Sequence, residues 1–396
     1  MTGKMAITLV AVAYNRPESL SRLLASLSRA SYLDYSVRLI ISIDHGGPDK
    51  VKEIADSFDW KFGEKKVIIH EQNLGLRKHI LQCGDLTEQY DNIIVLEDDV
   101  FVAKNFYLYA LSALEFYKDN KKVSGISLYS HKFNETAKLP FSPIKEEHDV
   151  FFLQIAASSG QLWTVRHWLD FREWYEKDTK DDGWDKVPEN IAGWPKSSWK
   201  KYFTKYLIEE NKFFVYPYDS LTTNFGDIGQ HFWKANSSAQ VPLDRVKDHY
   251  KFCEIEDTMA VYDAFCENYN LSAHFSNYPD RCTIDLYGTK KNLMIDGFLL
   301  SVNNYPYKIL RQYGMALKPI EENVYHDIPG DQIFLYDTSQ PVKSMGKSKS
   351  FIHSQYEYYY PGLDIRKATK LLFNSYTFSI LYKFISTKAL KSLQGK

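Results

Sequence analysis

Four short apolar runs near the start of the chain alternate with segments of helical pattern, and this alternation constrains the fold more than any other feature. The runs are Ala6–Ala13, Val37–Ile43, Val67–His70 and Asn92–Leu96. The last of them has no polar alternation, which is typical of a strand buried on both faces of a sheet. Strands separated by helices predict a mostly parallel sheet with helices on both faces, so we expect an α/β, Rossmann-like fold.

Charged and amide side chains follow each run. The carboxyl ends of parallel strands meet at one edge of a sheet, where ligands bind in folds of this type. The residues expected to bind a ligand at this edge are Arg16, Asp44, Asn73, Arg77, Glu97, Asp98 and Asp99. Taken alone, the acidic triplet is more simply a solvated turn. Together with two arginines on neighbouring strand ends, it indicates a site for a nucleotide diphosphate with a divalent cation.

Other ways of holding phosphate lack their motifs here. No GxGxxG follows the first run and no GxxxxGK[ST] occurs in the chain. Phosphate would therefore be held by arginine and a metal, and hard carboxylate oxygens suit Mn²⁺ or Mg²⁺. The formal net charge of -1 argues against a general nucleic-acid binder, so we expect no nucleic-acid partner.

Four segments resemble the nucleotide-sugar-binding half of GT-A fold glycosyltransferases. They are AVAYNRPESL, IISIDHGG, EQNLGLRKHI and IIVLEDDV, in this order and spacing. The likeness is greatest to N-acetylglucosaminyltransferase I and to bacterial polysaccharide glycosyltransferases with the same Glu-Asp-Asp motif. It implies a GT-A fold and an enzyme that uses a nucleotide-sugar donor.

The same resemblance implies a role for individual residues. Asp99 would bind the metal, Asp98 would lie near the ribose and Glu97 near the transferred sugar. Arg16 would meet the pyrophosphate, and Asp44 would read the base.

The second half of the chain resembles the acceptor-binding half of these enzymes, with one departure. The similarity runs from Trp194–Lys196 to Asn224–Gly226, but the position of the family's catalytic Asp holds Lys200 and Lys201. A lysine that is charged at pH 7 cannot accept the proton of an acceptor hydroxyl. Either the catalytic base lies elsewhere, or this half is only loosely related to the family.

An Asp-rich loop offers replacements for the missing base. We expect Asp182 and Asp185 to be catalytic, because Trp184 beside them could stack on a sugar. The alternative is that the loop is simply solvated and acidic. His231, in a glycine-rich segment, is expected as a second metal ligand with Asp99, as in many GT-A enzymes; a hydrogen-bonded structural histidine is the alternative.

The chain length suggests several units. We expect a donor half over residues 1–130, an acceptor half of the same domain over 131–275, a small α+β appendage over 276–340 and a helical tail over 341–396. Within them, Phe101–Tyr117 and Glu256–Asn268 have helical patterns.

The tail is strongly basic. From Pro341 onward it holds ten Lys or Arg residues against two acids, and its apolar residues recur at helical spacing. Such an amphipathic segment could lie on an anionic membrane surface, or it could dock on the body or on a partner subunit.

These patterns predict a metal-dependent glycosyltransferase of hexosyl or N-acetylhexosaminyl type. The expected donor is a nucleotide-diphosphate sugar, UDP-linked, and the acceptor a hydroxyl of a glycan or lipid-linked oligosaccharide in surface polysaccharide synthesis, with inversion. A sugar-phosphate nucleotidyltransferase and a non-catalytic sugar-nucleotide- or glycan-binding module are the alternatives. Four cysteines without a CxxC pair and no long apolar stretch indicate a cytoplasmic protein, peripheral on the inner face of the membrane.

Overall fold

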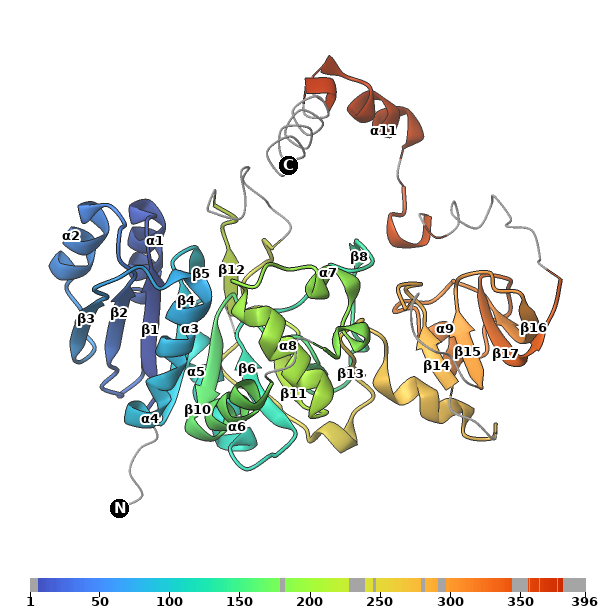
Figure 1. Ribbon diagram of the computed structural model, residues 1–396, viewed down its shortest axis with the longest axis horizontal. Coiled ribbons are helices and arrows are strands. Elements are labelled where there is room, and N and C mark those ends of the chain that lie inside the picture. The colour runs from blue at the N-terminus through green and yellow to red at the C-terminus, as the bar shows by residue number, and fades with distance from the viewer. Residues whose placement is uncertain are drawn as a thin grey trace.

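The computed structural model describes residues 6–178, 182–227, 239–244, 247–278, 282–290 and 297–343, together with residues 355, 357–362, 364–375 and 377–379. Figure 1 shows two sheets side by side. The first two thirds of the chain form the larger sheet, and the orange segment forms the smaller one.

The larger sheet has nine strands, in the order β13-β9-β11-β6-β10-β4-β1-β2-β3. They are β1 (Thr8–Ala13), β2 (Leu39–Ile43), β3 (Lys65–Ile69), β4 (Asn92–Glu97), β6 (Val123–Ser127), β9 (Val150–Leu153), β10 (Gln161–Thr164), β11 (Phe213–Pro217) and β13 (Val261–Tyr262). β1 to β4 pair in parallel, and β6 and β11 run in the same direction beyond the antiparallel β10. The sheet is mostly parallel, so the α/β fold class expected from the sequence is confirmed.

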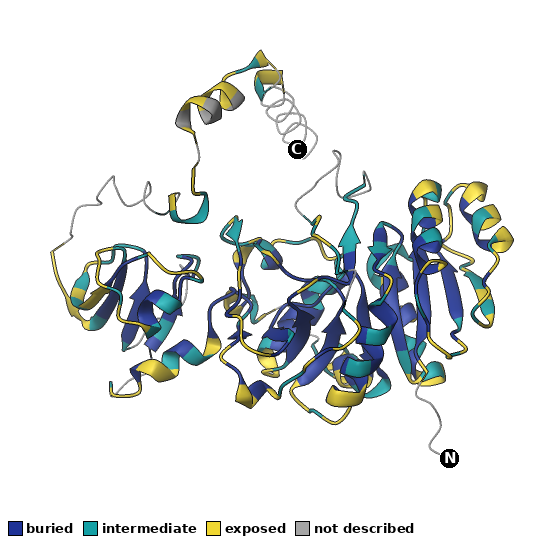
Figure 2. Ribbon diagram, turned by 180° about the vertical axis from the view of Figure 1, so that it is seen from behind, coloured by how far each residue is buried: buried dark blue, intermediate teal, exposed yellow. Residues whose placement is uncertain are grey.

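Helices cover both faces of this sheet, so β1 buries its side chains on both sides. Leu9 and Ala11 belong to one apolar cluster with α1, α2 and α5, whereas Val10 and Val12 belong to another with α3, α6 and α8. These helices are α1 (Pro17–Leu27), α2 (Asp49–Ser57), α3 (Gly75–Asp85), α5 (Phe106–Tyr117), α6 (Val165–Lys177) and α8 (Trp199–Glu209). Figure 2 shows the strands buried and the outer helix faces exposed.

Shorter elements connect these layers. They are α4 (Thr87–Tyr90), β7 (Phe133–Asn134), β8 (Leu139–Pro140), the 3₁₀ helix η1 (Trp184–Lys186), α7 (Glu189–Ala192) and the 3₁₀ helix η2 (Ile255–Asp257). The helix expected over Glu256–Asn268 is wrong: after η2 the chain extends into β13, which pairs with β9.

A small two-stranded sheet was not expected. The predicted helix over Phe101–Tyr117 starts only at Phe106, because β5 (Val100–Val102) pairs with β12 (Thr222–Asn224). This pairing brings a distant part of the chain beside the Glu97–Asp99 turn.

The smaller sheet follows the 3₁₀ helix η3 (Tyr269–Phe275) and has the order β14-β15-β17-β16. Its strands are β14 (Cys282–Asp285), β15 (Phe298–Ser301), β16 (Tyr307–Tyr313) and β17 (Ile333–Pro341), and α9 (Glu322–Tyr325) packs with them through Val324. We call this unit the appendage.

The described part of the tail contains α11 (Ile365–Leu372), drawn in red away from the sheets in Figure 1. Leu372, Phe373 and Phe378 are exposed there. No helix among the described residues is long and apolar enough to cross a membrane.

Candidate active site

The acidic triplet lies where the sequence places it, at the carboxyl end of β4. Arg16 stands beside it because Pro17 begins α1 directly after β1. The Arg16 guanidinium donates from Nη1 to Asp99 Oδ2 at 2.8 Å and from Nη2 to Asp98 Oδ1. One guanidinium therefore bridges two carboxylates, a geometry that its planar fork favours.

The electrostatics of this edge are dominated by burial and by repulsion between acids. Desolvation, followed by the charge of Asp99, raises the pKa of Glu97 to about 8, although Arg16 and Lys200 oppose the rise. Desolvation also raises the pKa of Asp98 to about 6, with Arg16 acting in the opposite direction. Because the acids outnumber the nearby guanidinium, added positive charge would stabilise their ionised forms.

Asp44 and Asn73 also lie at this edge, but they make structural hydrogen bonds. Asp44 is 5% exposed, and its carboxylate accepts hydrogen bonds from the backbone N–H groups of Leu74 and Gly75 at 2.8 and 3.0 Å. Asn73 Nδ2 donates to the carbonyl of His45 at 2.9 Å. Asp44 therefore fixes the start of α3, whatever contact it makes with a ligand.

Two helices, α3 with Arg77 and α8 with Lys200, contact each other near this edge. The Arg77 guanidinium carbon lies 5.0 Å from the centre of the Tyr202 ring, a cation–π contact between the two helices. Lys200 stands in the first turn of α8, and its charge acts on Glu97. The position that holds the catalytic carboxylate in the resembled family thus carries a cation that faces the donor edge.

The end of β12 and the turn after it contribute groups that the sequence resemblance assigned to the acceptor-binding half. Asn224 Nδ2 donates to Asp99 Oδ1 at 3.0 Å, and the Phe225 N–H donates to the Asp99 carbonyl at 2.9 Å. Farther along, Asp227 accepts hydrogen bonds from Ser19 Oγ, at 2.7 Å, and from Arg22. The turn is therefore tied both to Asp99 and to α1.

The remaining predicted residues are not brought to this edge. Asp182 and Asp185 are exposed beside Trp184, whose ring lies 5.8 Å from that of Tyr202. Among the described residues, no hydrogen bond or ion pair links either acid to the triplet. His231 lies outside the described residues.

The carboxylates fit a hard divalent cation bound together with phosphate. Mg²⁺ is commonly held by one or two carboxylates plus substrate phosphates, and Mn²⁺ also favours carboxylate oxygens. Asp98 and Asp99 supply such oxygens. In the described part of the chain no three His, Cys, Asp or Glu side chains are grouped to hold a metal by themselves. The donor's own phosphates would complete the ligand set.

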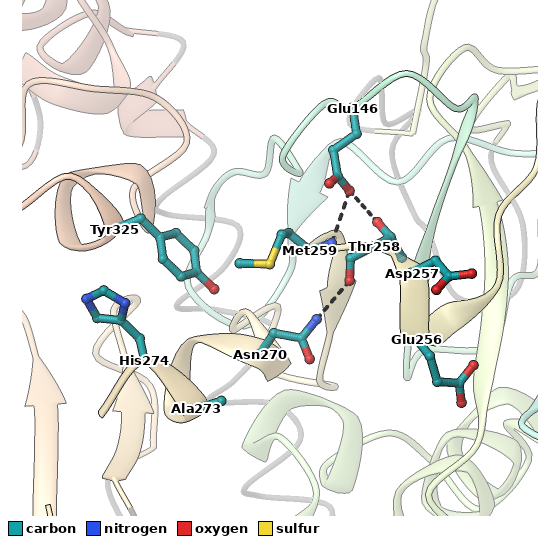
Figure 3. Close-up of a pocket in the computed structure, with 9 residues that line it drawn as sticks. All are labelled: Glu146, Glu256, Asp257, Thr258, Met259, Asn270, Ala273, His274 and Tyr325. Carbon is teal, nitrogen blue, oxygen red and sulfur yellow. Dashed lines mark hydrogen bonds between the residues drawn. The ribbon is translucent and has the colours of Figure 1, made fainter. Parts of the chain in front are cut away.

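A cavity of about 630 Å³ lies elsewhere, between the second half of the large sheet and the appendage. Figure 3 shows its lining: Glu146, Glu256, Asp257, Thr258, Met259, Asn270, Ala273, His274 and Tyr325. None of the residues predicted to bind the donor lines it.

Comparison with known proteins identifies the first part of the chain. Residues 8–188, a little under half of the sequence, match the family model described as glycosyl transferase family 2. This segment is similar to glycosyl transferase family 2 domains. No curated protein sequence matches the chain. The more specific resemblance to N-acetylglucosaminyltransferase I stays a prediction.

Solved structures with a similar arrangement include glycosyltransferases. S. aureus TarS 1–349 is 16% identical with a TM-score of 0.37, covering 55% of this chain and 59% of that one. The mannosyltransferase PcManGT from Pyrobaculum calidifontis, in complex with GDP-Man and Mn²⁺, is 10% identical with a TM-score of 0.31, covering 44% and 47%. GalNAc-T7 with UDP, GalNAc and Mn²⁺ is 12% identical with a TM-score of 0.39, covering 54% and 43%.

The chain spans less than two thirds of the length of each of these structures. Their similarity is too low to carry a conclusion about substrate or mechanism.

Proposed function

We propose that this protein is a metal-dependent glycosyltransferase. It moves a hexosyl or N-acetylhexosaminyl group from a nucleotide-diphosphate sugar, UDP-linked, to a hydroxyl of a glycan or lipid-linked oligosaccharide, with inversion, in surface polysaccharide synthesis. The observation that supports it most is the bridge from Arg16 to Asp98 and Asp99 at the carboxyl end of β4, within the segment that matches glycosyl transferase family 2.

The residues of this edge have separate tasks in the proposed reaction. Asp99, and in the prediction also His231, would hold Mn²⁺ or Mg²⁺, which neutralises charge on a departing diphosphate when it is bound. Two N–H groups of Arg16 donate to the acids. Its remaining N–H groups would be available to donate hydrogen bonds to a phosphate of the donor. Such preorganised donors stabilise charge that develops in the transition state.

Arg77, Asp44 and Asn73 would surround the donor nucleotide. Glu97 and Asp98 would contact its sugar and ribose, as the resemblance implies. Asp182 and Asp185 are the bases predicted from the sequence, and both are exposed.

The tail would keep the enzyme at the inner face of the membrane. The exposed Leu372, Phe373 and Phe378 provide apolar area, and Lys370 and Arg366 provide positive charge. Sedimentation with vesicles of anionic lipid tests this contact, and neutral vesicles serve as the comparison.

A ligand-stabilisation experiment tests the donor site. We expect UDP- or GDP-linked sugars to raise the melting temperature only with Mn²⁺ or Mg²⁺, because a ligand that binds the native state stabilises it by mass action. The Asp99→Asn variant should lose this shift, whereas Asp119→Asn, an exposed acid after α5, should keep it. A shift that survives chelation unchanged would contradict the metal dependence.

A non-catalytic sugar-nucleotide-binding module is the second candidate. It is favoured by the lysines at the family's base position: Lys201 Nζ donates to the carbonyls of Ala192 and Trp194 at 2.6 and 3.2 Å, which is a structural arrangement. Donor binding without release of a nucleoside diphosphate, across a panel of acceptors, would support this candidate.

A further inference from the structure

The loop that follows β6 leaves the large sheet beside the Glu97–Asp99 turn. β4 and β6 run in the same direction on either side of β10, so both end at the same edge. Gly160 lies between the two loops: a Cβ placed there would be 3.2 Å from Leu96 Cδ2 and 3.5 Å from Leu128 Cβ. The loop that leads to Glu135 therefore begins next to the donor edge.

Hydrogen bonds fix the chain on both sides of Glu135. Asn134 is buried, and its Oδ1 accepts hydrogen bonds at 3.0 Å from the backbone N–H groups two and three residues farther on. Asn134 Nδ2 donates to the carbonyl of Phe265 at 3.0 Å. Thr136 Oγ1 donates to Asn190 Oδ1 on α7 at 2.6 Å. Glu135 thus projects from a turn whose neighbours are held in place.

The Glu135 side chain itself is exposed, and among the described residues no hydrogen bond or ion pair engages its carboxylate. Desolvation has the largest single effect on its pKa and raises it, but Lys200, His131 and Lys138 together lower the pKa below its ordinary value. The charge of Lys200 also acts on Glu97, so one lysine lies within electrostatic range of both acids. Glu135 is therefore an ionised carboxylate that shares the electrostatic influence of Lys200 with Glu97 at the donor edge.

Two other acids of the second half are already engaged. Lys205 Nζ donates to both carboxylate oxygens of Asp178, at 2.8 and 2.9 Å. Asp227 is paired with Arg22 and also accepts from Ser19. Both of these carboxylates therefore already accept hydrogen bonds from side chains of the protein, whereas no such bond to Glu135 occurs among the described residues.

From this placement we propose that Glu135 is the general base of the transfer. This inference rests on the proposed glycosyltransferase function. The Glu135 carboxylate takes the proton of the acceptor hydroxyl while that oxygen bonds to the anomeric carbon. The bond from the anomeric carbon to the diphosphate oxygen breaks, and its electron pair leaves with the nucleoside diphosphate. Lys200, at the predicted position of the family's own base, favours the ionised form of this carboxylate through its charge.

Glu135→Gln tests the assignment, with Asp182→Asn and Asp185→Asn as competing variants and the exposed Glu147→Gln as the matched control. Mn²⁺ and four donors, UDP-N-acetylglucosamine, UDP-glucose, UDP-galactose and GDP-mannose, are each offered with p-nitrophenyl glycosides as acceptors. We expect nucleoside-diphosphate release by Glu135→Gln to fall about 10²- to 10⁴-fold, the usual contribution of a general base. Donor affinity by calorimetry and the melting temperature should stay unchanged.

A further readout separates chemistry from structure. Added formate should restore part of the rate in Glu135→Ala, because it can supply a carboxylate in the space left.

The outcomes are distinct. Wild-type turnover in Glu135→Gln with loss in Asp182→Asn or Asp185→Asn would overturn the assignment, and so would loss of donor affinity in Glu135→Gln. Donor binding by the wild-type protein without any transfer would overturn the proposed function, and the base with it.

Discussion

Two regions of this molecule that hold buried carboxylates differ in their surroundings. At the end of β4, Asp98 is 4% exposed and shares the Arg16 guanidinium with Asp99. Between the large sheet and the appendage, Glu321 is 3% exposed and accepts a hydrogen bond from the Tyr262 hydroxyl at 2.6 Å. The first region sets several acids against one cation, whereas the second sets one acid against a neutral hydroxyl.

The causes of the raised pKa values show what each region is built to accept. Burial is the largest cause in both, but the rise for Glu97 also comes from Asp99, a neighbouring acid. Burial raises the pKa of Glu321 to about 7 and the Tyr262 hydrogen bond opposes this rise, whereas the neighbouring acid Glu322 makes only the smallest contribution to it. Repulsion between acids is relieved by a cation, whereas burial alone is relieved by a proton. The β4 edge thus suits a metal and phosphate, and Glu321 suits a structural role.

Removing the guanidinium should have the largest effect. Arg16→Ala leaves the β4 acids without their cation and removes donors aimed at the diphosphate. We expect donor turnover to fall about 10²- to 10³-fold, as for the loss of one preorganised donor at a developing charge. Steady-state release of nucleoside diphosphate measures this loss.

Arg16→Lys sharpens the same test, because lysine keeps the charge but cannot bridge two carboxylates with a planar fork. Its turnover should lie between those of wild type and Arg16→Ala. Arg311→Ala, which breaks an ion pair to Asp327 in the appendage, should turn over donor like wild type. Equal turnover in wild type, Arg16→Ala, Arg16→Lys and Arg311→Ala would mean that the guanidinium at the β4 edge contributes no more to turnover than the one in the appendage.

The β4 edge could be predicted from the sequence because the residues of this site directly follow strands along the chain. Arg16, Asp44 and Glu97–Asp99 follow buried apolar runs directly, and the parallel order of those strands brings them together without further information. The family match over residues 8–188 covers this part of the chain.

The acceptor side could not be predicted in the same way, since long-range pairing assembles it. The link from Asn224 to Asp99 depends on β5 pairing with β12, and a helical pattern that began at Phe101 concealed β5. Likewise, the loop that leads to Glu135 starts beside the β4 edge only because β10 inserts antiparallel between β4 and β6. Neither strand pairing can be predicted from the periodicity of a single segment of the sequence.

The free energy of unfolding should depend on pH through Glu321, which lies between the large sheet and the appendage. The pKa of Glu321 rises from 4.5 to about 7 on folding, so the folded state holds the proton more tightly. Stability from this group is complete below pH 4.5 and is lost as pH rises through 7. The loss amounts to about 3 kcal/mol, at 1.36 kcal/mol for each unit of pKa.

Urea unfolding at pH 4.5 and pH 8 measures this loss, with Glu321→Gln as the comparison. Glutamine still accepts from Tyr262 but does not titrate, so the variant should lose less stability than wild type between the two pH values. The exposed Glu64, which pairs with Arg38 far from this interface, provides the control Glu64→Gln. An identical pH dependence in Glu321→Gln and wild type would show that Glu321 is not protonated in the folded state.

The smallest expected effect concerns the amide that orients Asp99. Asn224→Ala removes the 3.0 Å hydrogen bond to Asp99 Oδ1 but leaves Arg16 in place on Oδ2. Partners that orient a metal ligand commonly contribute 10- to 100-fold in affinity, so we expect Mn²⁺ binding to weaken about tenfold. Electron paramagnetic resonance of free Mn²⁺ during a titration gives this affinity without any turnover.

Gln240→Ala is the matched control, because the Gln240 amide donates to the Phe225 carbonyl at 3.2 Å in the same turn and does not touch an acid. If both variants bound Mn²⁺ as tightly as wild type, Asp99 would be held by Arg16 alone, and the β12 turn would only complete the fold.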